Sequence, residues 1–253
     1  MSGKEINKEE IKQIPEVRLT VVYDNKSKVK GLDADWGFAC YIEFGETKLL
    51  FDTGDDGKIL LNNMKILDIN PEEIGLLFLS HEHHDHTGGL KAFLKKNPKV
   101  KIYFPQSFPD KLKEKFKESG TVPIPIASFL EIQPNVFTLG EFEGTTPEQA
   151  LAIRSSKGII IITGCAHPGI INIIEKAKES FKNESIYLVL GGFHLYKSSN
   201  KEIEEVIEKL LDLSVVNVAP THCTGNKAHK MFKKKYGNYY IEIGAGKIVT
   251  IEK

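Results

Sequence analysis

The 253-residue chain is predicted to adopt an α/β (α+β) fold of mixed sheets with helices on their outer faces. Segments rich in β-branched and aromatic residues occur first as neighbouring strands with a tight hairpin, and later alternate with helical patterns. Polar side chains of metal-binding types directly follow five apolar segments, as at strand ends in layered α/β folds. No low-complexity linker divides the chain, so residues 1–253 are expected to form a single domain.

The first half is expected to begin with strands and to add helices later. Apolar residues at helical spacing predict helices over residues 59–67 and 89–96. Asn70 is expected to cap a short helical turn that Pro71 opens. The expected strands span residues 17–23, 38–44, 48–51, 76–80 and 101–104.

The second half begins near Phe129 and alternates more regularly between strands and helices. Helices are expected over residues 168–181, 199–213 and 227–235, and Ser199 with Glu202 forms a capping-box pattern at the start of the second one. The expected strands span residues 150–154, 158–163, 185–190, 215–219, 239–243 and 248–251.

Residues 81–86 read His-Glu-His-His-Asp-His and follow an apolar run that is typical of a buried strand. Alternate side chains at a strand end reach the same spot, so His81 and His83 can chelate one cation while Asp85 and His86 reach a neighbouring one. Imidazole and carboxylate suit zinc, iron or manganese better than calcium. The pattern predicts a metalloenzyme with one or two divalent ions, zinc first; a polar surface loop is the alternative.

The composition excludes several classes of protein. Thirty-four basic residues balance 34 acidic ones, which argues against nucleic acid or an anionic membrane as a partner. The amino-terminal residues lack the apolar core of a secretory signal, and no apolar run approaches the length of a membrane span. Three widely spaced cysteines indicate no disulfide framework. We therefore expect a soluble cytoplasmic protein.

The histidines gather at the predicted strand ends. Seven of the eight lie in the polar segments that follow apolar strands, and His229 is the exception. His167 follows the strand at 158–163, His194 follows the strand at 185–190, and His222 follows the strand at 215–219. Their common placement predicts one shared site.

These motifs resemble those of the metallo-β-lactamase superfamily. The resemblance rests on Asp-Thr-Gly at residues 52–54, the His-x-His-x-Asp-His run and His222 after its strand, and it covers nearly the whole chain. It implies a four-layer αββα sandwich of two mixed sheets with one or two metals at the edge between them. Thr-Gly-Cys-Ala-His-Pro-Gly at 163–169 and Gly-Gly-Phe-His at 191–194 resemble a narrower group. That group is the dihydropteroate-synthase-like proteins, named for a ribofuranosylaminobenzene phosphate synthase of methanopterin biosynthesis.

The superfamily resemblance implies roles for individual residues. His81 and His83 would bind the first metal, and Asp85, His86 and His222 the second. Asp52 would orient a ligand histidine, although Asp-Thr-Gly also suits a simple turn.

The chain departs from the superfamily pattern in its second half. Cys165 replaces a bridging aspartate, and is either a thiolate ligand or a small buried residue. Many superfamily members supply a histidine from a loop that corresponds to residues 146–149, which read Thr-Pro-Glu-Gln here. His167 is expected to complete the first metal's ligand set.

Two further features bear on the substrate. His194 follows two glycines, and its imidazole could act as a catalytic acid or base or make a structural hydrogen bond. Residues 24–36 carry three lysines and the single tryptophan, so this loop could wall a pocket for a small, anionic or phosphorylated substrate. Solvation of a surface explains the lysines equally well.

Three function classes follow. The first is a metal-dependent hydrolase in which a metal-activated hydroxide attacks an ester, phosphoester or related bond of a small molecule. The second, implied by the narrower resemblance, is a transferase that condenses a dihydropterin diphosphate with ribofuranosylaminobenzene 5'-phosphate. The third is a metal-binding protein without catalytic activity.

Overall fold

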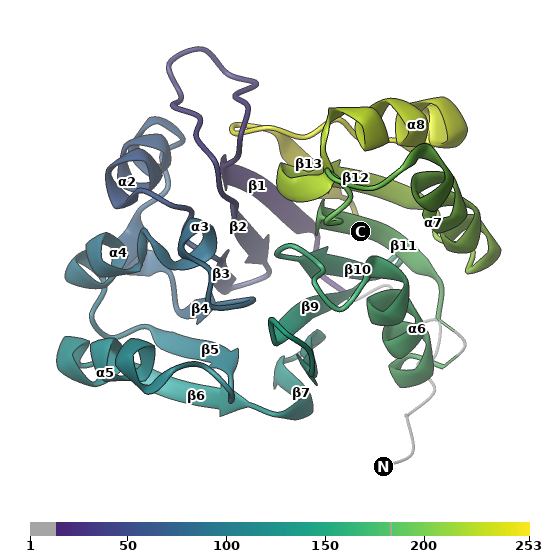
Figure 1. Cartoon of the computed structure of the whole chain (residues 1–253). Coiled ribbons are helices and arrows are strands. Elements are labelled where there is room, and N and C mark those ends of the chain that lie inside the picture. The colour runs from purple at the N-terminus through teal and green to yellow at the C-terminus, as the bar shows by residue number, and fades with distance from the viewer. Residues whose placement is uncertain (1–13, 183) are drawn as a thin grey trace.

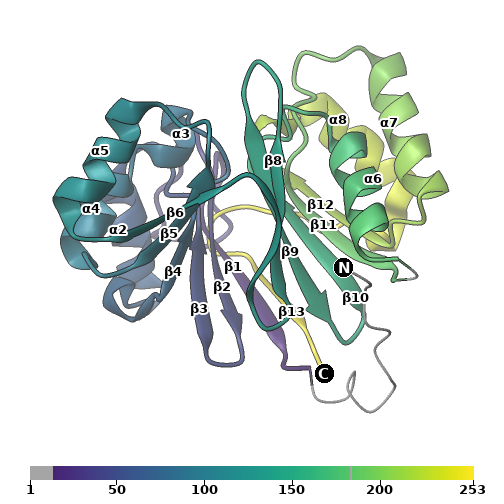
Figure 2. The same ribbon diagram turned by 90° about the horizontal axis from the view of Figure 1, so that it is seen from below.

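A computed structural model describes residues 14–182 and 184–253, and in it two β-sheets pack face to face between two layers of helices (Figure 2). Each sheet contains both parallel and antiparallel strand pairs. The expected αββα sandwich of two mixed sheets is therefore confirmed.

The first sheet has seven strands in the order β13-β1-β2-β3-β4-β5-β6. Its pairs are antiparallel from β13 to β3 and parallel from β3 to β6. The strands are β1 (Val17–Tyr23), β2 (Ala39–Phe44), β3 (Thr47–Phe51), β4 (Leu76–Phe78), β5 (Lys101–Pro105), β6 (Val122–Ile126) and β13 (Ile248–Ile251).

The second sheet has six strands in the order β12-β11-β10-β9-β8-β7. Here β12, β11 and β10 are parallel, and the remaining pairs are antiparallel. The strands are β7 (Ser128–Gln133), β8 (Val136–Phe142), β9 (Glu148–Ser155), β10 (Gly158–Thr163), β11 (Ile186–Gly192) and β12 (Asn217–Thr221).

A shared core lies between the sheets. Phe51 and Phe78 of the first sheet stack at 5.4 Å between ring centroids and belong to the same buried cluster as Ile162 and Leu190 of the second sheet. Burial of side chains this large stabilises the pairing of the sheets by about 1.5–3 kcal/mol for each one. The strand ends that carry polar residues are thereby held in one place.

The helices cover the two outer faces (Figure 1). Their apolar faces form a separate buried cluster with each sheet. The helices on the first sheet are α2 (Gly57–Ile66), α4 (Leu90–Lys96) and α5 (Asp110–Ser119), and those on the second are α6 (Ile170–Ser180), α7 (Asn200–Asp212) and α8 (Asn226–Tyr236). The predicted caps are confirmed, because Asn70 caps the short helix η1 (Pro71–Glu73), and Ser199 and Glu202 form a capping box on α7.

The structure differs from the sequence prediction in three places. Residues 105–148 contain α5 and the strands β6, β7 and β8, which the sequence analysis did not assign. Residues 239–243 form no strand; they follow the short helix η3 (Gly237–Tyr239) and make an isolated bridge from Tyr240 to β12. The metal-binding motif does not stay extended, because the one-turn helix α3 (His84–Thr87) begins inside it.

No helix within the described residues is long and apolar enough to cross a membrane.

Candidate metal centre

The candidate site lies where the parallel strands of both sheets end. Asp52 follows β3, His81 comes shortly after β4, and Cys165, His194 and His222 follow β10, β11 and β12. Within the described residues, seven non-glycine residues have positive φ, and four of them lie at these ends: Asp52, Ala166, His194 and His222. Such conformations cost energy and persist where the surrounding structure requires them, often at functional sites.

Asp52 organises the first sheet's side of the site. It is fully buried and accepts hydrogen bonds from the Ser80 backbone N–H (2.7 Å) and the Ser80 hydroxyl (2.6 Å). The His86 Nδ1 atom lies 2.6 Å from the same carboxylate. Because the Ser80 hydroxyl donates to Asp52, its oxygen accepts the bond from His81 Nδ1 at 2.9 Å.

His222 is held by a residue from the other sheet. Its Nδ1 lies 2.9 Å from the Asn25 side-chain oxygen, and the Asn25 amide donates to the His222 carbonyl at 3.1 Å. The Gly37 backbone N–H also donates to the Asn25 oxygen, which identifies that atom as an acceptor. His222 Nδ1 therefore carries a proton, and its Nε2 atom lies 3.1 Å from Asp85 Oδ2.

Glu148, at the start of β9, holds the loop after β10. Its fully buried carboxylate accepts backbone hydrogen bonds from residues 164, 165, 166 and 167 at 2.9–3.1 Å. A fifth bond joins it to His167 Nδ1 at 2.9 Å. Burial alone would raise the pKa of Glu148, but the bonds from His167 and the neighbouring imidazoles keep that pKa well below its usual range.

Four imidazoles thus share one hydrogen-bonding arrangement. In His81, His86, His167 and His222 the Nδ1 atom is bound by an oxygen atom, so Nε2 is the ring nitrogen that each residue can offer to a metal. The Nε2 atoms of His86 and His222 face each other at 3.3 Å, and the buried Nε2 of His81 has no hydrogen-bond partner. A bound cation would stabilise ring nitrogens that converge in a buried site in this way.

The electrostatics of the site favour neutral imidazoles at His81 and His86. Burial, followed by repulsion from His222, lowers the pKa of His86 to about 3. Burial, with a contribution from His86, also lowers the pKa of His81 well below its usual value. Neutral imidazole is the form that binds a metal. The residues present therefore fit the divalent ions predicted from the sequence.

The potential ligand atoms form two overlapping groups. Asp85, His86, Cys165 and His222 make one group, and His81, Cys165 and His167 make another. In each group the ligand atoms lie within 4.8 Å of one another. Cys165 belongs to both, and its sulfur lies 3.3 Å from His86 Nε2. Cys165 is therefore within reach of both groups, and its role as a thiolate ligand stays a prediction.

The other residues of the motif lie differently. His83 is exposed, its ring is 4.8 Å from those of His81 and His167, and it forms a further possible group with His81 and Asp85. His84 points away and pairs with Asp55 at 2.7 Å, and Glu82 is exposed. The structure therefore brings together His81, His83, Asp85, His86, His167 and His222, with Asp52 behind them.

An aromatic rim surrounds the opening of the site. The Trp36 indole donates to Asp85 Oδ2 at 2.9 Å, and its ring lies 4.8 Å from that of His222 and 6.2 Å from that of Tyr196. His194 is exposed, with its ring 4.6 Å from that of His167 and 5.6 Å from that of Tyr196. Because Trp36 and Tyr196 remain 47% and 42% exposed, they can pack against a bound ligand.

The lysines of residues 24–36 do not all face this opening. Lys26 bonds to Asn226 of α8 at 2.8 Å, and Lys28 pairs with Glu242 at 2.6 Å. These two contacts tie the loop to the carboxyl-terminal region. Trp36, rather than these lysines, is therefore what the loop contributes to the site.

Two residues that support the site were not predicted from the sequence. Asn25 directly follows Asp24 at the end of β1, so the strand-end pattern applied to the other strands would have pointed to this segment as well. Glu148 had no comparable signal, because the sequence predicts a loop at residues 146–149, whereas the glutamate lies at the start of β9.

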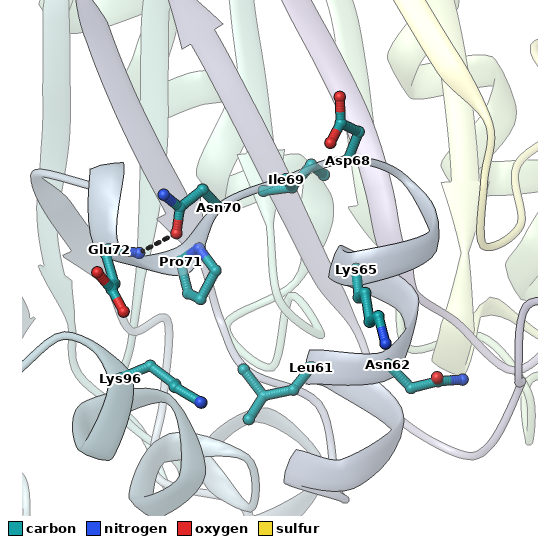
Figure 3. A pocket seen from close by; sticks show the side chains of 9 residues that line it. All are labelled: Leu61, Asn62, Lys65, Asp68, Ile69, Asn70, Pro71, Glu72 and Lys96. Carbon is teal, nitrogen blue, oxygen red and sulfur yellow. Dashed lines mark hydrogen bonds between the residues drawn. The ribbon is translucent and has the colours of Figure 1, made fainter.

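A shallow depression elsewhere on the surface lies between α2, η1 and α4 (Figure 3). Leu61, Lys65, Asp68 and Lys96 are among the residues that line it, and it contains no histidine or cysteine. Its surroundings lack the convergent donor atoms found at the strand ends.

Comparison with known proteins agrees with this geometry. Residues 37–222 match the metallo-beta-lactamase superfamily. The chain belongs to this superfamily. The matched region includes most of the strand-end residues described above, from Asp52 to His222.

Two relatives are similar over most of their length. A 7,8-dihydropterin-6-methyl-4-(beta-D-ribofuranosyl)-aminobenzene-5'-phosphate synthase of Methanocaldococcus jannaschii is 32% identical, over 80% of this chain and 84% of the relative. The crystal structure of Tm1679, described as a metal-dependent hydrolase of the beta-lactamase superfamily, is 28% identical. It has a TM-score of 0.78 and covers 94% of this chain and 100% of Tm1679.

The fold extends to more distant proteins. The metallo-beta-lactamase fold protein YhfI from Bacillus subtilis has a TM-score of 0.71 at 14% identity and covers 93% of this chain and 99% of YhfI. This likeness concerns the architecture alone.

Proposed function

We propose that the chain is a metal-dependent enzyme that cleaves a phosphoester, ester or related bond of a small molecule, with water as the acceptor in the first candidate reaction. The observation that carries this proposal is a set of four imidazoles held at Nδ1 by Asn25, Ser80, Asp52 and Glu148, which leaves the Nε2 atom of each as the nitrogen available at one site. A site for catalysis requires such prepared ligands.

His81, His83 and His167 would hold one ion, Asp85, His86 and His222 a second, and Cys165 would be shared. Nitrogen, sulfur and carboxylate donors favour zinc, with iron or manganese as alternatives. A divalent ion in this place polarises an oxygen of the substrate and makes a bound water more acidic.

The chain's own residues position and wall the reacting groups. Asp52, Asn25 and Glu148 fix the orientation of the ligand imidazoles. Trp36 and Tyr196 form an apolar wall at the opening. His194 stands beside His167, where an imidazole nitrogen can deliver a proton to the leaving group or remove one from the nucleophile.

A second candidate is transfer to an aminobenzene acceptor. The exposed rings of Trp36 and Tyr196 suit flat aromatic substrates, and the 32% identity to the aminobenzene phosphate synthase supports the same reaction. In this reaction the ribofuranosylaminobenzene 5'-phosphate attacks a dihydropterin diphosphate, and the diphosphate leaves. The two candidates differ in the acceptor, which is water or the amine of the aminobenzene.

One assay separates them. The zinc-loaded protein is incubated with the dihydropterin diphosphate, with and without the aminobenzene phosphate, and diphosphate release is measured. Release only in the presence of the acceptor, with formation of the coupled product, supports transfer. Release without the acceptor supports hydrolysis. Cleavage of neither this substrate nor a panel of phosphoesters and esters by protein of verified metal content contradicts the proposal.

Replacement of His194 by asparagine tests the proposed proton transfer. Asparagine tolerates the positive φ of 52° at this position, so the backbone is expected to stay in place. Turnover is expected to fall by about 10²–10⁴, the usual size of a positioned proton transfer, while metal content stays at the wild-type level. Turnover and elemental analysis of the same preparations give the result.

His229→Gln is the control, because His229 lies on α8 outside the strand-end segments and is expected to leave turnover unchanged. Normal turnover in the His194→Asn protein would end the acid–base assignment. A parallel loss of metal would make His194 a ligand instead.

A further inference from the structure

Two of the three free cysteines lie together under the candidate site. Cys165 follows β10, Cys223 follows β12, and β11 runs between those strands (Figure 1). The Cys223 sulfur lies 3.5 Å from the Cys165 carbonyl oxygen. The sulfurs of both cysteines and one ring nitrogen of His194 lie within 4.8 Å of one another.

The absence of a side chain on Gly192 allows this approach. A Cβ atom at Gly192 would lie 2.5 Å from the Cys223 sulfur and 3.1 Å from the Cys165 Cα atom. Both distances are shorter than ordinary contacts, so the two cysteines meet in the space that a larger residue of β11 would fill. The same Cβ atom would also lie 2.5 Å from the Gly164 carbonyl oxygen, so the close approach of β10 requires glycine at this position as well.

We propose that Cys165 and Cys223 form an intramolecular disulfide when the metal-free protein meets a hydroperoxide. One thiolate attacks the peroxide and becomes a sulfenic acid as the O–O bond breaks and hydroxide leaves. The second thiol then displaces the sulfenic oxygen, which departs as water, and the S–S bond forms. The hydroxide takes up the proton lost by the first thiol, so with hydrogen peroxide the two cysteine sulfurs are oxidised, the peroxide is reduced, and two molecules of water are the net product.

Access to the pair is through the site itself. Both cysteines are only 2–3% exposed, but His194 and His83 at the opening are exposed to solvent. A hydroperoxide such as hydrogen peroxide is little larger than water, and can therefore enter where a macromolecule cannot. Cys40, on β2 in the shared core, has no comparable route because it is fully buried among apolar side chains.

The reaction and metal binding would exclude each other. The Cys165 sulfur lies 3.3 Å from His86 Nε2, so the sulfur that bonds to Cys223 is the one available to an ion. The competition between the disulfide and a metal rests on the proposed function, whereas the disulfide itself rests on the cysteine geometry alone. Oxidation would therefore remove one donor from the metal site, and a bound ion would protect both thiols.

The test uses the full-length protein after removal of metal by a chelator. Hydrogen peroxide is added, and free thiols are counted after denaturation, together with the intact mass. Two of the three thiols are expected to disappear, the mass is expected to fall by two hydrogen atoms, and dithiothreitol is expected to reverse both changes. Peptide mapping should link the segment that contains Cys165 to the segment that contains Cys223.

Matched cysteine variants make the result specific. Cys40→Ser is expected to lose both of its remaining thiols as the wild type does. Cys223→Ser and Cys165→Ser are each expected to give no intramolecular link, and thermal melting checks that they are folded. A link to Cys40, an equal loss of thiols in all variants, or oxygen addition that dithiothreitol cannot reverse would overturn the proposal.

Zinc alone separates the two steps. Added before the peroxide, it is expected to slow disulfide formation by about tenfold or more, since a coordinated sulfur is not free to react. Equal rates with and without zinc would leave the disulfide in place and refute its competition with the metal. If no metal binds but the disulfide forms, the proposed function fails and the oxidation site remains.

Discussion

His81→Ala is expected to abolish turnover and reduce the bound metal while the protein still unfolds cooperatively. The His81 side chain is fully buried, and its Nε2 atom has no hydrogen-bond partner among the described residues. Loss of a ligand removes the charge stabilisation that a metal provides, and this effect is several kcal/mol, or a factor of about 10³ or more in rate. The fold should persist because its shared core does not include the metal site.

The measurements are turnover, metal content by elemental analysis, and thermal unfolding. His84→Ala is a close control, because it removes a neighbouring imidazole that is exposed and paired with Asp55. It is expected to retain metal and activity. A His81→Ala protein with wild-type metal content and turnover would contradict the site assignment, and a non-cooperative melt would contradict the expected independence of the fold.

Glu148→Ala is expected to cause the largest loss of stability of any single change at the site. The substitution removes an acceptor of four backbone bonds and one imidazole bond, all buried. Each buried donor left without an acceptor costs about 1–3 kcal/mol, although local rearrangement recovers part of this. A loss of about 3–5 kcal/mol in the free energy of unfolding follows, against a total of about 5–15 kcal/mol for a typical protein.

Urea unfolding of metal-free protein measures this change without a contribution from the ion. Glu148→Gln is the matched variant, because the amide oxygen can still accept from residues 164–166 while its NH₂ group opposes the donors of His167. It should lose less stability than alanine but still misplace His167 and lower metal affinity. A difference of less than about 1 kcal/mol between wild type and Glu148→Ala would show that the carboxylate does not hold this loop.

Local patterns in the sequence were sufficient for the elements with strong periodicity or clear caps. The helices α6, α7 and α8 and the strands β10 and β11 lie within a few residues of their predicted bounds. Each contains its own signal, such as the capping box at Ser199 or the apolar run 159–162. The metal-binding motif at 81–86 was visible for the same reason, since its donors are contiguous in the chain.

Strands that depend on pairing with a distant strand could not be predicted from such local patterns. The strand β6 reads Val-Pro-Ile-Pro-Ile, and its prolines argue against a strand unless it lies at the edge of a sheet, as it does. Residues 239–243 have a strand-like composition, but they form only an isolated bridge from Tyr240 to Val218 of β12, in which the Ile241 N–H donates to the Val218 carbonyl. Composition does not reveal whether a neighbouring strand has a free edge.

The sequence by itself determined the fold class and the residue types that could bind a metal, because alternation, capping and donor chemistry are local properties. Only the tertiary structure decided which donors share a site and what holds them. Asn25 meets His222 across 197 positions of the chain, and Glu148 reaches His167 from the start of a different strand. These contacts exist because the core between the sheets aligns the ends of β1, β10 and β12, and no short-range pattern encodes that alignment.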